Sequence, residues 1–110
     1  MIPTSVRIFV CTERQDMRRS FDALALVVRE SLALDPESGA LFVFASKRSN
    51  RLKVLWFDHN GYCLLYKRLH RALFEPPVGE EGAQAVRISS AELGRLLAGI
   101  DREQKRRARA

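Results

Sequence analysis

The Lys and Arg side chains are the residues of this sequence best suited to a chemical role. The chain of 110 residues carries 19 basic and 13 acidic residues, a formal net charge of +6 and an isoelectric point near 10.0. The excess is uneven, because residues 41–71 contain seven basic residues and only one acidic residue, Asp58. A concentrated basic excess favours an anionic partner, and it is typical of proteins that bind nucleic acid.

The predicted nucleic-acid contacts lie in a polar turn, on the strands beside that turn, and at the start of a helix. They are Arg18, Arg19, Lys47, Arg48, Arg51, Lys53, Lys67, Arg68 and Arg71. Each Lys or Arg that neutralises a phosphate releases a condensed counterion, so binding should weaken as salt rises. The alternative interpretation is a solvated sheet edge whose charges discourage strand-to-strand aggregation.

No pattern in the sequence indicates catalysis, so we expect neither an enzyme nor a cofactor. A G-x-S-x-G elbow, a P-loop and a G-x-G-x-x-G loop are all missing from the sequence. The possible metal ligands form no C-x-x-C or H-x-x-x-H pair, and they are Cys11, His59, Cys63 and His70. We expect both cysteines to be buried thiols that pack as small apolar groups.

A metal-dependent nuclease is another functional hypothesis. Such an enzyme needs carboxylates that converge on divalent ions. The candidate carboxylates are Asp16, Asp22, Asp35 and Asp58. Each has a simpler interpretation: a helix N-cap, a helix surface residue, a helix exit and a turn former, respectively. The nuclease hypothesis therefore has little support.

The basic residues must be positioned by a sheet and two helices. Apolar residues at spacings of three and four predict a long helix over 16–34, with Asp16 as its N-cap. Three apolar runs at 41–45, 52–57 and 62–67 predict a β-meander with a tight turn at Asn60-Gly61. Shorter strands are expected at 6–10, 72–75 and 86–88, and the S-x-x-E sequence at 89–92 predicts the start of a short helix.

We therefore predict an α+β fold, in which a mainly antiparallel sheet packs against one long N-terminal helix, with a short C-terminal helix. Its expected core residues are Phe21, Leu24, Val28, Phe42, Phe44, Leu55 and Trp56. Residues 1–101 are expected to form a single domain, and 102–110 a basic tail that frays or stays disordered. No leader or long apolar segment is found, so we expect a cytoplasmic protein.

A series of short motifs identifies a family that the chain resembles. In chain order they include Asp16-Met17-Arg18-Arg19, Leu41-Phe42-Val43-Phe44, Lys53-Val54-Leu55-Trp56, Lys67-Arg68-Leu69 and Gly99-Ile100-Asp101. Over residues 6–101 the chain resembles the TnpB accessory proteins, the second open reading frame products of IS-sixty-six-type insertion sequences. The resemblance implies an accessory role in DNA transposition, beside a separate and larger transposase that carries out strand transfer.

The resemblance leaves two functions open. The first is a DNA-binding accessory factor that uses the basic hairpin surface. The second is a protein–protein interaction module that contacts the transposase without binding DNA directly. The expected partners are thus DNA and the transposase of the same element, with a homo-oligomer also open, and no membrane partner is expected.

Overall fold

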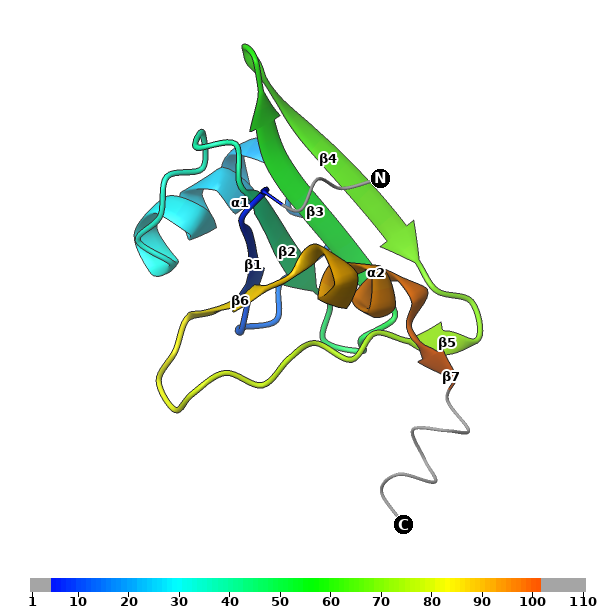
Figure 1. Cartoon of the computed structure of the whole chain (residues 1–110). Helices are drawn as coiled ribbons and strands as arrows, with labels where there is room; N and C mark the ends of the chain where they lie inside the picture. Colours follow the sequence, from blue (N-terminus) through cyan, green and yellow to red (C-terminus); the bar gives the residue numbers. More distant parts are fainter. Residues whose placement is uncertain (1–4, 102–110) are drawn as a thin grey trace.

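The computed structural model describes residues 5–101 as a five-stranded sheet with one short helix on each face (Figure 1). The strand order is β4-β3-β2-β1-β6. These strands are β1 (Ile8–Cys11), β2 (Leu41–Ala45), β3 (Arg51–Asp58), β4 (Gly61–Arg68) and β6 (Ala85–Ile88). β1 and β2 are parallel, and the other neighbouring pairs are antiparallel. The short strands β5 (Ala72–Leu73) and β7 (Ile100–Asp101) pair as a separate antiparallel ribbon.

A helical crossover joins β1 to β2. It contains α1 (Phe21–Leu26) and a π-helical turn, η1 (Val27–Ser31). Parallel strands need such a crossover, because the chain must return to the starting end of the sheet before the second strand begins. The second helix, α2 (Ser90–Ala98), follows β6 and packs on the opposite face of the sheet.

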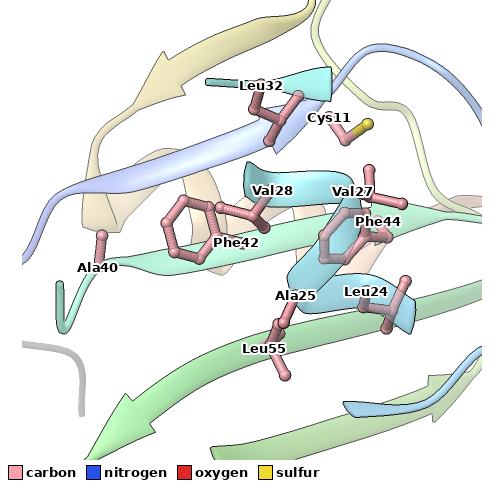
Figure 2. Packing of buried hydrophobic residues seen from close by; sticks show 10 residues of the cluster. All are labelled: Cys11, Leu24, Ala25, Val27, Val28, Leu32, Ala40, Phe42, Phe44 and Leu55. Carbon is pink, nitrogen blue, oxygen red and sulfur yellow. The ribbon is translucent and has the colours of Figure 1, made fainter. Parts of the chain in front are cut away.

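Two apolar clusters hold the helices to the sheet, and alternation along each strand separates them. Phe42, Phe44 and Leu55 pack against α1 and η1, where Figure 2 shows the two phenylalanine rings beside Val28, Val27 and Leu24. The residues between them on the strands face α2, and this second cluster includes Ile8, Val10, Val43, Leu52, Val54, Leu93 and Leu96. Both faces of the central strands are therefore covered, which explains their almost continuous apolar sequences.

The predicted fold class is wrong in two respects. The sheet is mixed rather than mainly antiparallel, and no long N-terminal helix exists, because helical residues run only from Phe21 to Ser31. Within the described residues the protein is mainly β, with two short helices.

Local hydrogen bonds explain why the helix does not begin at Asp16. The Asp16 carboxylate accepts from the backbone N–H of Arg18 at 2.9 Å, and its carbonyl accepts from that of Arg19 at 3.1 Å, so a turn forms there. The Arg19 carbonyl then accepts from the Lys53 ammonium at 2.6 Å. In a continuous helix this carbonyl would instead accept from a backbone N–H four residues later. Ser20, in extended backbone, is the N-cap residue in place of Asp16.

The predicted core is confirmed for Leu24, Val28, Phe42, Phe44 and Leu55, each at most 1% exposed. The prediction for Phe21 is wrong. This side chain is 42% exposed at the first residue of α1, and burial fails there because the helix starts later than expected. Trp56 is half-buried and packs against the α2 cluster.

The predicted meander and the second helix start are confirmed. β3 and β4 form a hairpin in which Asp58 pairs with Gly61, so His59 and Asn60 occupy the turn, one residue earlier than predicted. The Ser89 hydroxyl accepts from the Glu92 backbone N–H at 3.1 Å, and the Glu92 carboxylate accepts from that of Ser89 at 3.0 Å. This reciprocal pair is the predicted capping box. The predicted tail at 102–110 lies outside the described residues.

Candidate nucleic-acid interface

A groove of about 630 Å³ lies at the end of the sheet where β2 and β4 end and β3 begins. Its walls come from the segment that follows β1, from the β2–β3 loop, and from the adjoining ends of β3 and β4. The lining residues are Gln15, Asp16, Met17, Arg18, Ser46, Lys47, Arg48, Asn50, Arg51 and Tyr66. Four of these side chains are cationic and one is a carboxylate, so we refer to this hollow as the basic groove.

Hydrogen bonds fix the β2–β3 loop that carries Lys47 and Arg48. The Ser46 backbone N–H donates to the Arg51 carbonyl at 2.9 Å, and the Ser46 hydroxyl accepts from the Arg51 backbone N–H at 3.1 Å. Ser49, a buried residue with a φ of 61°, donates its backbone N–H to the Ser46 carbonyl at 3.0 Å. Lys47 and Arg48 are exposed on this ordered loop, so little backbone entropy is lost when they contact a ligand.

The segment after β1 is attached to the same loop. The Arg14 guanidinium donates from Nη1 to the Ser46 carbonyl at 3.1 Å and to the Ser49 hydroxyl at 2.6 Å. The Gln15 backbone N–H donates to the Ala45 carbonyl at 2.9 Å, beside the end of β2. Arg14 was not among the predicted contacts, and its role here is to hold two walls of the basic groove together.

Arg51, Lys53 and Tyr66 form one array on the sheet face that α1 covers. Arg51 donates from Nη1 to the Tyr66 hydroxyl at 3.0 Å. Lys53 is only 5% exposed, and its Nζ lies 4.7 Å from the centroid of the Tyr66 ring. The same Nζ donates to the Arg19 carbonyl, as described above. Lys53 therefore ties β3 and β4 to the segment before α1 and is not free to contact a ligand.

Asp16 partly neutralises the basic groove. Its carboxylate accepts from Nε and Nη2 of Arg18, and the shortest of these contacts, from Nη2, measures 2.6 Å. Hydrogen bonds from the Arg18 side chain and backbone hold the pKa of Asp16 well below its usual range. Among the described residues, this is the single ion pair that involves a side chain lining the groove. Three of its four cations therefore have no carboxylate partner within residues 5–101.

The structure brings together most, but not all, of the predicted contact residues. Arg18, Lys47, Arg48 and Arg51 line the basic groove, and Arg51 and Arg68 share a neighbouring hollow of about 210 Å³ with Tyr66. Exposed Arg19 donates to the Gln15 side chain at 2.9 Å, next to the groove wall.

Two predicted residues lie elsewhere. Lys67 pairs with Leu52, so it points to the α2 face, where its Nζ donates to the Leu97 carbonyl at 2.9 Å. Arg71 is exposed in the segment after β4. This segment is attached to the β2–β3 loop, because the backbone N–H groups of Leu69 and Phe74 donate to the carbonyls of Asn50 and Ser49. Arg71 lines none of the hollows described here.

Tyr66 is a groove residue that the sequence analysis missed, although a signal for it exists. The structure pairs Tyr66 with Lys53 and Arg68 with Arg51. Counting outward from the predicted turn at Asn60-Gly61 shifts these pairs but still places Tyr66 and Arg68 on the sheet face of Arg51 and Lys53. The same count would have separated Lys67 from these residues, because neighbours along a strand point to opposite faces. No comparable signal identifies Arg14, whose partners lie more than thirty residues away in sequence.

The remaining features of residues 5–101 offer little other chemistry. No group of three His, Cys, Asp or Glu side chains in this range could hold a metal ion. Burial raises the pKa of the Cys11 thiol, which disfavours a reactive thiolate. A hollow of about 240 Å³ beside α2 is lined by Glu75, Glu92, Arg95 and apolar groups, so its charges are mixed. Neither described helix has the length and apolar content of a bilayer span.

The fold and the basic groove define a small, mainly β protein with a cationic surface site. Residues 6–107 match the IS66 Orf2-like proteins, and the chain belongs to that family. This confirms the resemblance found in the sequence motifs and associates the chain with an accessory role in the transposition of insertion sequences.

Two relatives come from Sinorhizobium fredii. The chain is 48% identical to the uncharacterized protein y4hO over 103 residues, which cover 92% of this chain and 88% of y4hO. It is 36% identical to the uncharacterized protein y4jC over 96 residues, which cover 87% of this chain and 80% of y4jC. No solved structure matches the chain significantly.

Proposed function

We propose that this protein is a non-catalytic accessory factor in the transposition of an insertion sequence, and that it binds DNA through the basic groove. The strand-transfer chemistry belongs, in this proposal, to a separate transposase encoded by the same element. The observation that carries the proposal is the convergence of Arg18 and of the local cluster Lys47, Arg48 and Arg51, from two separate stretches of sequence, on one groove. Family membership supports the link to transposition.

The electrostatics of the groove suit a phosphate backbone. Lys47 and Arg48 project from a loop that is already ordered, and Arg51 lies at the base of that loop. Guanidinium groups match phosphate geometry because their donors form a planar fork. Because Asp16 neutralises Arg18, three phosphate contacts are expected, and they would give a slope of log K against log salt of about −3.

The test is a gel-shift or anisotropy titration of duplex DNA across a salt series. Lys47→Glu combined with Arg48→Glu should weaken binding strongly and make the salt slope shallower by about 2. The matched control is Arg87→Glu with Arg95→Glu, which makes the same change in net charge on β6 and on α2, away from the groove. Equal losses in both double variants would show a nonspecific charge effect and refute the groove as the site.

An interaction module that contacts the transposase is the second candidate, and exposed apolar side chains on α1 favour it. Phe21 and Leu26 are 42% and 53% exposed, respectively. Large apolar side chains that are exposed on the surface are available for contact with a protein partner. Co-purification with the transposase from nuclease-treated extract separates the two candidates, because nuclease destroys a DNA bridge. The interaction module is favoured if Leu26→Glu abolishes co-purification with the transposase and the double variant Lys47→Glu with Arg48→Glu leaves it intact.

A further inference from the structure

Tyr66 lies at the boundary between two cationic hollows. Together with Arg51 it lines both the basic groove and the neighbouring hollow that also contains Arg68. Tyr66 is 49% exposed, although its ring is a large apolar group. An exposed aromatic ring with cations on both sides has the arrangement with which proteins bind the bases and phosphates of unpaired strands.

The Tyr66 ring is held in place before any ligand binds. Its hydroxyl accepts from Arg51, and the Lys53 ammonium lies over the ring, 4.7 Å from the centroid. Lys53 is itself anchored on the Arg19 carbonyl. Because the ring is already fixed, stacking a base on it costs less side-chain entropy than stacking a base on a mobile ring would.

The pairing of Arg51 with Arg68 is a second and independent sign of an anionic ligand. These residues are directly opposite each other on β3 and β4, so both side chains leave the same face of the sheet. Like charges in such a cross-strand pair are destabilising. Within residues 5–101 neither guanidinium forms an ion pair with a carboxylate. An anion between them would relieve the repulsion.

We infer that the basic groove binds single-stranded DNA, with a base stacked on Tyr66, one flanking phosphate held between Arg51 and Arg68, and the other held by Arg48. The inference rests on the proposed function and narrows it from DNA in general to unpaired nucleotides. A duplex offers phosphates to the same cations, but its bases are stacked on one another and do not expose a face to Tyr66.

The test compares a labelled oligothymidine of about 12 nucleotides with a duplex of equal strand length by fluorescence anisotropy. Wild-type protein should bind the single strand more tightly. Tyr66→Leu keeps an apolar side chain but removes the ring, and it should lower single-strand affinity roughly 5- to 100-fold. Duplex affinity should stay within about twofold, because phosphate contacts do not involve the ring. Tyr66→Phe keeps the ring and should retain single-strand binding.

The outcomes separate this inference from the proposed function. Salt-dependent binding of both DNA forms with no effect of Tyr66→Leu would overturn the stacking inference and leave the DNA-binding proposal intact. Failure of the wild-type protein to bind either form at low salt would overturn both. Tighter binding of oligouridine than of oligothymidine would overturn the assignment to DNA.

A second measurement does not depend on the folding of a variant. An oligonucleotide that carries 5-iodouracil can be photocrosslinked to the wild-type full chain, and the crosslinked peptide identified by mass spectrometry. Crosslinks at Tyr66 are expected, because a stacked aromatic ring lies against the base. Crosslinks confined to segments outside β4 would refute the inference, whatever the behaviour of Tyr66→Leu.

Discussion

Replacing Lys53 with Met should destabilise the fold without removing a DNA contact. The substitution removes a hydrogen bond from a charged donor, which contributes about 1.5–3 kcal/mol, and a cation–π contact of about 1 kcal/mol. The Met side chain fills similar space with apolar atoms, and this offsets the loss by about 1 kcal/mol. The free energy of unfolding should therefore fall by about 1.5–3 kcal/mol, and the melting midpoint by roughly 6 to 14 °C.

Circular dichroism during thermal and urea denaturation measures this loss, and Lys47→Met is the matched control. Lys47 is exposed on the β2–β3 loop, so the same substitution there should leave the melting midpoint unchanged and weaken DNA binding. The two lysines, both predicted from the sequence as DNA contacts, should therefore show opposite effects. An unchanged midpoint for Lys53→Met, together with a clear loss of DNA affinity, would show that Lys53 contacts the ligand and would refute the buried role.

Four further substitutions test the groove, the second helix and the core. Asp16→Asn keeps the acceptor for the Arg18 backbone N–H but removes the negative charge, so DNA affinity should rise and the salt slope steepen by about 1; weaker binding in the anisotropy titration would contradict this. Ser89→Ala removes the hydroxyl cap of α2 and should lower the free energy of unfolding by about 0.5–2 kcal/mol in urea titrations. The Ser89 backbone N–H lowers the pKa of Glu92, so the charged cap stabilises the fold fully above the ordinary value of 4.5 and is lost as pH falls through the lower folded pKa. Glu92→Gln should accordingly be less stable than wild type at neutral pH and match it in strong acid. Phe44→Ala should cost about 3–5 kcal/mol, because its ring is fully buried against α1, and an unchanged urea midpoint would place the core elsewhere.

Local sequence signals were sufficient for the elements that local hydrogen bonds or short turns define. The Ser89 capping box and the β3–β4 hairpin are both fixed by residues close together in the chain, and both were predicted. The start of the N-terminal helix was predicted wrongly, because it depends on a residue far away in the sequence. The Lys53 ammonium, 34 residues away, takes the Arg19 carbonyl, so the apolar spacing from Met17 onward does not extend into a helix. Periodicity along one segment cannot reveal such a competitor.

The candidate site shows the same division. The clustering of Lys47, Arg48 and Arg51 is local and was predicted from the turn between two apolar runs. The roles of Lys53 and Lys67 depend on which sheet face each side chain occupies and on what covers that face. Both lysines interrupt apolar strands, but one is buried under the segment before α1 and the other reaches the end of α2. The sequence shows the charge, whereas only the packing of the helices shows whether it is available.

The error in sheet topology bears directly on the site. β1 and β2 are parallel, and β4 runs in the same direction. The C-terminal ends of these three strands therefore lie at the same end of the sheet. The segments that follow β1 and β2 therefore carry Arg18 and Lys47 to the place where β4 ends. If β1 ran antiparallel to β2, as in a simple meander, Arg14 and Arg18 would leave the sheet at its opposite end. The helical crossover thus completes the basic groove, because it supplies the wall that Arg14 ties to the β2–β3 loop. Shortening residues 32–40 should therefore disturb DNA binding even though this segment lines no part of the groove, because the shorter return to β2 would shift β1 and its wall.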